Sequence, residues 1–166
     1  MEKYVYTHTS MGRIKYDPPR PGMREKSRAS GRNNQQYWCI LEVDREITRY
    51  YRWLIERRLW GLTAIQPDWL CQPSWDAHVS IVRGEQPRRN HDLWKKYDGV
   101  SVEFTYAHYP RKTTMEDRER RFSKDGDFWF IDVECPLIDL IRDELGLRTH
   151  HHYHLTVGRT YDTRLR

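Results

Sequence analysis

Six short stretches of the chain are rich in bulky, β-branched or regularly alternating apolar residues, and this pattern predicts β-strands. Successive side chains of a strand point to opposite faces, so alternation gives a strand one apolar and one polar face. The predicted strands are residues 4–7, 37–43, 78–81, 100–106, 127–134 and 154–157.

Two further segments carry apolar residues at helical spacing. Asp44 is placed to cap the first helix, which runs to about Trp60, and Gly61 follows its end. Pro136 suits the first turn of the second helix, and Gly146 closes it. A shorter helical piece is expected at 93–97. The inward-facing residues are Ile47, Tyr50, Tyr51, Leu54, Ile55 and Leu59 in the first helix, and Leu137, Leu140, Ile141 and Leu145 in the second.

Two stretches show neither pattern and are expected to be loops. Residues 11–36 are rich in Pro, Gly, Arg, Lys and Asn, and loops of this length in a compact domain are usually functional covers or disordered. One interpretation is a basic flap near the functional site, with Tyr16 and Arg20 as ligand contacts; the alternative is a flexible arm without such a role. Residues 111–124 are almost wholly charged and predict a solvated connection.

The order of elements repeats along the chain. Each half contains a bulky strand with an inner acid, an amphipathic helix, and then a short strand that begins with histidine. A length of 166 residues suits one domain and is short for two. The pattern therefore predicts a single α+β domain over residues 1–166, with two pseudo-symmetric lobes of antiparallel sheet plus helix around a central groove.

Composition narrows the expected partners and location. The net charge of +5, from 29 basic and 24 acidic residues, favours anionic partners. Seven Trp and eleven Tyr exceed the needs of a small core, and base stacking is one use of the surplus, with core packing as the other. Without an apolar run of about 18 residues or a leader pattern, no membrane association is expected. Three cysteines without C-x-x-C spacing fit reduced thiols in the cytoplasm.

A four-residue pattern of histidine, apolar, hydroxyl and apolar residues occurs twice. The copies are His78-Val79-Ser80-Ile81 and His154-Leu155-Thr156-Val157, and an arginine, Arg83 or Arg159, follows each at the same offset. Random placement in a chain of this composition gives about 0.1 occurrences of the full pattern. On a strand, the histidine and hydroxyl of each copy share one face. The repetition therefore marks both copies as candidate functional residues.

Two imidazoles and two hydroxyl groups around one anion are suited to cleaving a phosphodiester. In-line displacement at phosphorus needs a base on the attacking oxygen and an acid on the leaving oxygen. Histidine suits both roles because its pKa lies near neutrality, so His78 and His154 are the candidate pair, with the two roles unassigned. Ser80 and Thr156 would donate hydrogen bonds to the non-bridging oxygens. This scheme requires no metal and no cofactor.

Neighbouring residues are candidate substrate contacts. Arg83 and Arg159 suit a phosphate clamp, although their odd offset from the histidines points them to the other face of a regular strand. Trp75 and Tyr153 immediately precede the motif strands and either stack on bases or pack in the core. Asp76 is near enough in sequence to orient the first histidine, a role that a backbone carbonyl fills equally well.

A histidine cluster surrounds the second motif. Residues His150, His151, His152 and His154 suggest a metal site, but neighbours in a strand or turn point in different directions. No acidic or cysteine ligand sits at a zinc-like interval either. We therefore expect no metal. Either His151 or His152 is expected to line the groove and contact the substrate's second phosphate, with His152 as the candidate residue.

The paired motifs resemble those of the two-histidine (2H) phosphoesterase superfamily. The resemblance covers residues 78–81 and 154–157 together with the repeated order of elements. It implies a bilobal α+β fold, metal-independent catalysis, and substrates with 2′,3′-cyclic phosphates or 2′-hydroxyl-assisted phosphodiester bonds. It also implies that His78 and His154 are catalytic and that Ser80 and Thr156 hold phosphate.

Two longer stretches narrow this resemblance. Gln72-Pro73-Ser74-Trp75-Asp76-Ala77 and Leu93-Trp94-Lys95-Lys96-Tyr97 are similar to segments of bacteriophage anti-CBASS phosphodiesterases, which linearise the cyclic di- and trinucleotide signals of bacterial immunity. The implied function is cleavage of 3′–5′ bonds in such signals, in the host cytoplasm if the chain is phage-encoded. An RNA 2′,3′-cyclic phosphodiesterase and a non-catalytic nucleotide-sequestering protein are the alternatives. The sequence points to no protein partner.

Overall fold

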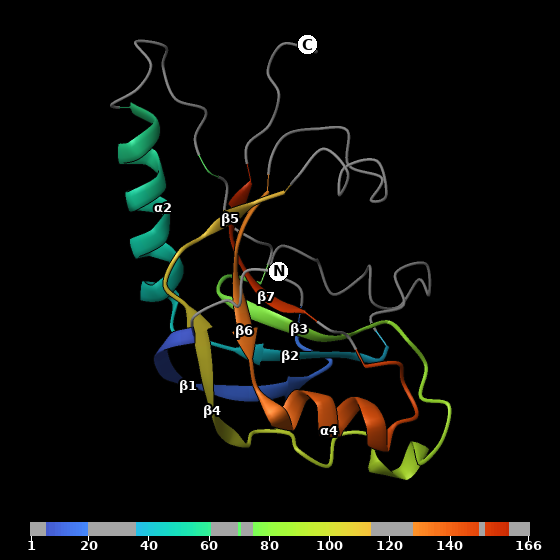
Figure 1. Cartoon of the computed structure of the whole chain (residues 1–166). Helices are drawn as coiled ribbons and strands as arrows, with labels where there is room; N and C mark the ends of the chain where they lie inside the picture. The colour runs from blue at the N-terminus through green and yellow to red at the C-terminus, as the bar shows by residue number, and fades with distance from the viewer. Residues whose placement is uncertain are drawn as a thin grey trace, which may run out of the picture.

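A computed structural model describes residues 6–19, 36–60, 70, 75–113, 128–149 and 152–159. Most of the predicted elements have a counterpart within these ranges, at slightly different boundaries (Figure 1). The elements are β1 (Tyr6–Tyr16), β2 (Trp38–Glu42), α2 (Arg45–Trp60), β3 (His78–Arg83), the 3₁₀-helix η1 (His91–Leu93), β4 (Ser101–Ala107), β5 (Arg111–Lys112), β6 (Phe128–Glu134), α4 (Pro136–Glu144) and β7 (Tyr153–Arg159).

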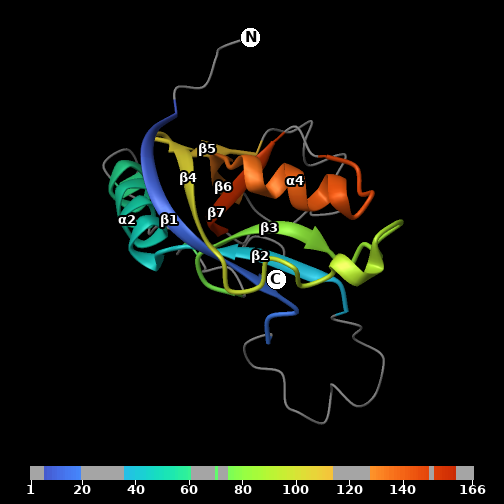
Figure 2. The same cartoon turned by 90° about the horizontal axis from the view of Figure 1, so that it is seen from below.

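The strands form one antiparallel sheet that closes on itself. The order is β4-β1-β2-β3-β7-β6-β5, and β4 also pairs with β6. This extra pairing joins six strands into a closed barrel and leaves β5 outside it, paired with β6. Figures 1 and 2 show strands β1, β2 and β3 crossing strands β6 and β7 at a steep angle, with β4 between the two groups.

The predicted architecture of two lobes around a central groove is wrong. Strands from both halves of the chain share one barrel, because β3 pairs directly with β7 and β4 pairs with both β1 and β6. The described part of the chain is mostly sheet, with two α-helices. The order β2-α2-β3 does recur as β6-α4-β7, so the repeat seen in the sequence is a repeat of elements within one barrel.

A single row of fully buried aliphatic residues runs across five strands. Neighbours in the row lie opposite each other in the β1–β2, β2–β3, β3–β7 and β6–β7 pairings, and each residue has 0 % of its surface exposed. Burial of each such side chain contributes about 1.5–3 kcal/mol. The row therefore fixes which face of every strand is buried. Its members are Ile14, Leu41, Val79, Leu155 and Ile131.

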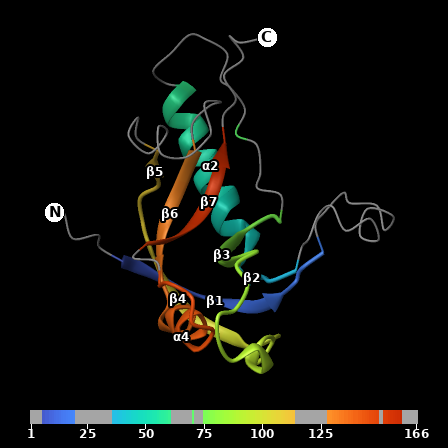
Figure 3. The ribbon, with the colours of Figure 1, turned by 90° about the vertical axis from the view of Figure 1, so that its right-hand side faces the viewer.

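The two helices follow the predicted capping, but the predicted packing is wrong at two positions. Tyr50 and Leu140, expected to face inward, are 55 % and 46 % exposed. The Asp44 carboxylate accepts a 2.9 Å hydrogen bond from the Glu46 backbone N–H at the start of α2. Gly146, with φ of 66°, ends the turn after α4. Figures 1 and 3 place α2 beside β7 and α4 at the opposite end of β6. Among the described helices, none combines the length and apolar character needed to cross a membrane.

Strand β1 extends to Tyr16, where a loop is expected from Met11 onward. Gly12 explains the difference. A Cβ atom at this position would lie 2.6 Å from the Leu41 Cδ1 atom, so this glycine permits close approach of β2 and does not mark a turn. Residues 20–35, which make up most of the proposed flap, and residues 114–127 lie outside the described ranges.

Leu155→Ala should lower the free energy of unfolding by about 2–5 kcal/mol, because it leaves a cavity in the buried row. Urea denaturation followed by circular dichroism measures this change. The matched control is Leu140→Ala on α4, where the side chain is 46 % exposed and the change should stay within about 0.5 kcal/mol. Equal stability of the two variants would contradict the buried row.

Candidate functional site

The two motif strands lie side by side and bring their polar residues together. In the antiparallel β3–β7 pairing, Val79 lies opposite Leu155. The same register places His78 beside Thr156 and Ser80 beside His154. In a regular antiparallel pair, such cross-strand neighbours have Cβ atoms about 4.5–5.5 Å apart and diagonal neighbours are roughly 7–8 Å apart, and the two histidines stand in the diagonal relation. We call His78, Ser80, His154 and Thr156 the motif patch.

The motif patch is accessible because burial alternates along both strands. Val79 and Leu155 point into the buried row, whereas the four polar residues are half-buried on the other face of the barrel wall. This alternation agrees with the prediction that the histidine and the hydroxyl residue of each motif share one face of the strand. A ligand that reaches one histidine is therefore also near the other.

The backbone just before β3 orients the ring of His78. Its Nδ1 atom lies 3.0 Å from the backbone carbonyl oxygen of Asp76, and donation to that oxygen leaves Nε2 as the basic nitrogen. Asp76 has φ of 59°, a left-handed conformation that turns its carbonyl toward the ring. Burial lowers the pKa of His78 below 6.5, and the nearby Arg83 acts in the same direction. Asp76 opposes this shift through its hydrogen bond and its charge, and the net lowering of the pKa favours the neutral imidazole, the form required of a general base.

His154 has different surroundings. The Phe130 ring lies edge-on to it, with 5.4 Å between ring centroids. Asp132 lies opposite His154 in the β6–β7 pairing and is 1 % exposed. Arg111 holds both carboxylate oxygens of Asp132, at 2.7 and 2.6 Å, and its guanidinium carbon lies 4.8 Å from the Phe130 ring centroid. Arg111 fixes the buried Asp132 carboxylate through both of its oxygens. This carboxylate and the Phe130 ring edge restrict the space around His154.

Aromatic residues extend from the patch on the side of His78. The Trp75 ring lies edge-on to His78, with centroids 5.6 Å apart, and Trp38 lies 4.9 Å beyond Trp75. Both tryptophans are half-buried. The structure therefore places Trp75 beside the motif patch, as the substrate-contact prediction requires, and adds Trp38 to the same wall.

Two tyrosines predicted as substrate contacts lie on the buried face. Tyr16 packs against Trp94, with centroids 4.8 Å apart, and burial raises its pKa. The Tyr153 hydroxyl donates a 2.8 Å hydrogen bond to Asp139. Neither side chain joins the motif patch, because both occupy inward positions of their strands. They are core residues, the alternative that the sequence left open for Tyr153.

The remaining predicted contacts lie around the ends of the motif strands. Arg83 is exposed at the end of β3, opposite Trp38 in the β2–β3 pairing. Arg159 ends β7, with its guanidinium carbon 4.9 Å from the Phe128 ring centroid. His152 is exposed directly before β7. Of these three residues, Arg83 lies near enough to His78 to lower the pKa of that histidine.

Sequence reasoning missed the Arg111–Asp132 pair. Asp132 was visible only as an acid inside a bulky strand, and Arg111 stood at the start of a stretch expected to be a solvated loop. Within the described ranges, no three His, Cys, Asp or Glu side chains gather as a metal site would require. His150 and His151 lie outside those ranges.

Arg111→Ala should lower the free energy of unfolding by about 2–3 kcal/mol, since it leaves the buried Asp132 carboxylate without its cation. This value is below that for a fully buried pair, because the Arg111 side chain is 38 % exposed. Adding Asp132→Asn to the same chain should recover part of the loss. Chemical denaturation measures both variants, with exposed Lys112→Ala as the control. A neutral Arg111→Ala variant would show that the pair carries no stability.

Comparison with known proteins gives no relative for this chain. No protein-family model, no curated protein and no solved structure matches it. The candidate site therefore depends on strand register, burial and side-chain contacts alone.

Proposed function

We propose that the protein is a metal-independent phosphodiesterase that cleaves 3′–5′ bonds of cyclic di- and trinucleotides. The observation that carries the proposal is the motif patch, in which two histidines and two hydroxyl groups from distant parts of the chain share one accessible face. Acid–base cleavage of a phosphodiester needs two proton-transferring groups on opposite sides of one phosphorus atom. The diagonal relation of His78 and His154 across β3 and β7 suits two groups that act from different sides of one phosphate.

The two environments suggest how the roles divide. The Nε2 atom of His78 takes the proton of the ribose 2′-hydroxyl, whose oxygen attacks the adjacent phosphorus. The bond from phosphorus to the 5′-oxygen breaks, and His154 gives that oxygen its proton. The product is a linear oligonucleotide with a 2′,3′-cyclic phosphate end. Ser80 and Thr156 donate hydrogen bonds to the non-bridging oxygens, where negative charge grows in the transition state.

Charge and aromatic placement support a nucleotide as substrate. A net charge of +5 favours an anionic ligand. The Trp38–Trp75 wall beside His78 offers aromatic surface on which a base stacks next to the reacting phosphate. The choice of cyclic oligonucleotides over RNA ends follows the narrower sequence resemblance, and a substrate panel separates the two.

The full chain should be incubated in EDTA with four kinds of substrate: cyclic dinucleotides, cyclic trinucleotides, a 2′-deoxy cyclic dinucleotide, and RNA carrying a 2′,3′-cyclic phosphate. Liquid chromatography with mass spectrometry then identifies the products. Linear products from the cyclic ribonucleotides, and an intact 2′-deoxy compound, are expected. His78→Ala and His154→Ala should each reduce the rate by about 10²–10⁴, whereas exposed His91→Ala should not.

Other outcomes of this panel point elsewhere. Cleavage of the 2′-deoxy compound would remove the 2′-hydroxyl from the mechanism. Products from RNA ends alone would replace the proposed substrate, and depletion of free nucleotide without any product would indicate a sequestering protein. Loss of activity in EDTA that added metal restores would contradict metal independence.

The acidic limb of the kcat/KM profile should have its midpoint below pH 6.5, because burial lowers the pKa of His78 and the neutral base persists into more acidic solution. Arg83→Ala should move this limb upward, since it removes a positive charge that opposes protonation of His78. Glu42 lies opposite His78 on β2 and is paired with Lys15 at 2.6 Å. This pair is the same in the wild type and in Arg83→Ala, so it does not account for the difference between their pH profiles. A limb that moves downward in Arg83→Ala would exclude His78 as the titrating base.

A further inference from the structure

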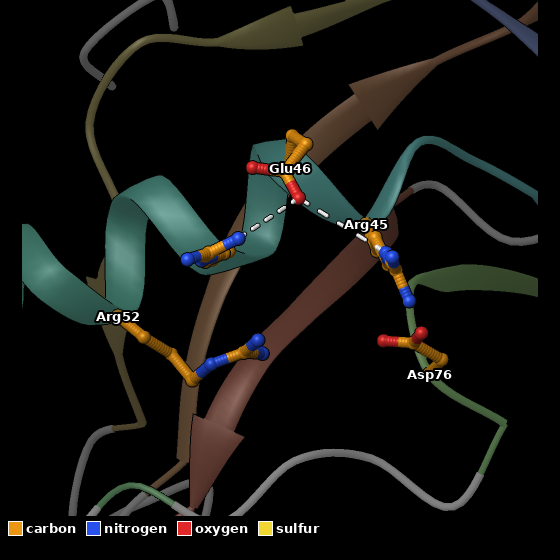
Figure 4. Close-up of a pocket in the computed structure, with 5 residues that line it drawn as sticks. Arg45, Glu46, Arg52 and Asp76 are labelled. Carbon is orange, nitrogen blue, oxygen red and sulfur yellow. Dashed lines mark hydrogen bonds and ion pairs between the residues drawn. The ribbon is translucent and has the colours of Figure 1, made fainter.

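A charged cavity of about 320 Å³ lies between α2 and the segment that enters β3 (Figure 4). Its described lining consists of Arg45, Glu46, Arg49, Arg52 and Asp76. Small-molecule sites span about 300–1,000 Å³, so the volume suits one phosphodiester group with part of its sugar. We propose that this cavity binds the second, non-reacting phosphodiester of a cyclic oligonucleotide, a subsite that rests on the proposed function.

The charge of the lining matches a phosphodiester. Three arginines and two carboxylates give a net charge of +1, the complement of the single negative charge of a phosphodiester. Glu46 already lies near Arg49 and Arg45, at 3.4 and 4.0 Å. These pairs are largely exposed and contribute little to stability, so both guanidinium groups are available to turn toward an anion. Guanidinium is the side chain that recognises phosphate by paired hydrogen bonds.

Helical spacing brings the three arginines to the cavity. Arg45, Arg49 and Arg52 stand at i, i+4 and i+7 in the first two turns of α2, so they share one face of the helix. This end of the helix also carries the positive pole of its dipole. Figure 4 shows the Arg45 side chain extending toward Asp76, with Arg52 on the other side of the cavity.

Arg52 forms the inner wall. It is only 9 % exposed, and its Nη1 atom donates a 3.1 Å hydrogen bond to the Val157 carbonyl oxygen. Burial lowers its pKa, and Arg49 acts in the same direction, whereas Asp76 and Glu56 oppose them. A desolvated cation beside an open cavity is stabilised by an anion placed there.

The cavity adjoins the motif patch on both of its strands. Val157, held by Arg52, directly follows Thr156. Asp76 presents its side chain to the cavity while its carbonyl oxygen accepts the hydrogen bond from His78. An anion in the cavity is thus close to the reacting phosphate but separate from it.

This subsite predicts discrimination by phosphate number. A cyclic dinucleotide carries two phosphodiesters and fills both positions, whereas a mononucleoside 2′,3′-cyclic phosphate carries one and fills only the motif patch. Arginines of the cavity should therefore matter for the first ligand and not for the second. Glu46→Gln, which removes a competing carboxylate, should strengthen binding of the first ligand alone.

The test combines Arg45→Ala and Arg49→Ala in one chain, since both side chains are exposed and their loss should not disturb the core. Arg57→Ala, on the last turn of the same helix, is the matched control. Calorimetry on chains that also carry His154→Ala measures binding without turnover. The double variant should weaken cyclic dinucleotide binding by about tenfold or more, and leave binding of the mononucleoside cyclic phosphate and the Arg57→Ala control unchanged.

A second measurement separates this proposal from the proposed function. Titration with dimethyl phosphate, a simple phosphodiester, should shift the guanidinium NMR signals of Arg45, Arg49 and Arg52 whether or not any nucleotide is cleaved. Turnover of cyclic dinucleotides with unchanged affinity in the double variant, and no such shifts, would overturn the subsite and leave the enzyme intact. Equal weakening of both ligands would also overturn it.

Discussion

The contact between Val79 and Leu155 is the constraint on which the candidate site depends. Both residues are fully buried in the row that crosses five strands, and their register decides which side chains face the other way. A shift of either strand by one residue would bury its own histidine and expose its aliphatic residues, because side chains alternate with period two. Hydrophobic packing therefore positions the polar groups, although it makes no direct contact with a substrate.

Near-identical motifs acquire different properties from their surroundings. His78 is oriented by the Asp76 carbonyl, whereas His154 lies beside β6, which contributes both the Phe130 ring edge and the opposing Asp132. An enzyme that needs one neutral and one protonated histidine requires such asymmetry. The barrel supplies it because each motif strand has a different outer neighbour, β2 for β3 and β6 for β7.

Local features were predictable from the sequence, and long-range pairing was not. Helix α2, its Asp44 cap and the alternation along β3 follow from spacing that neighbouring residues determine. The expectation of two lobes was wrong because a pattern shows which face of a strand is apolar but not which strand lies at its edge. The same limit hid Arg111, whose partner Asp132 is 21 positions away, and made Gly12 look like a loop residue when it accommodates Leu41.

Each strand that carries a motif histidine pairs over many residues with one neighbour and over few with the other. Strand β3 pairs with β2 along most of its length, and β7 likewise with β6, yet β3 and β7 meet at the single pair of Val79 and Leu155. The candidate site thus spans the pairing of neighbouring barrel strands that has the fewest paired residues. Opening the β3–β7 contact would change the gap between the imidazoles while both strands keep their pairings with β2 and β6, so a change in the width of the site would not require either wall to unfold.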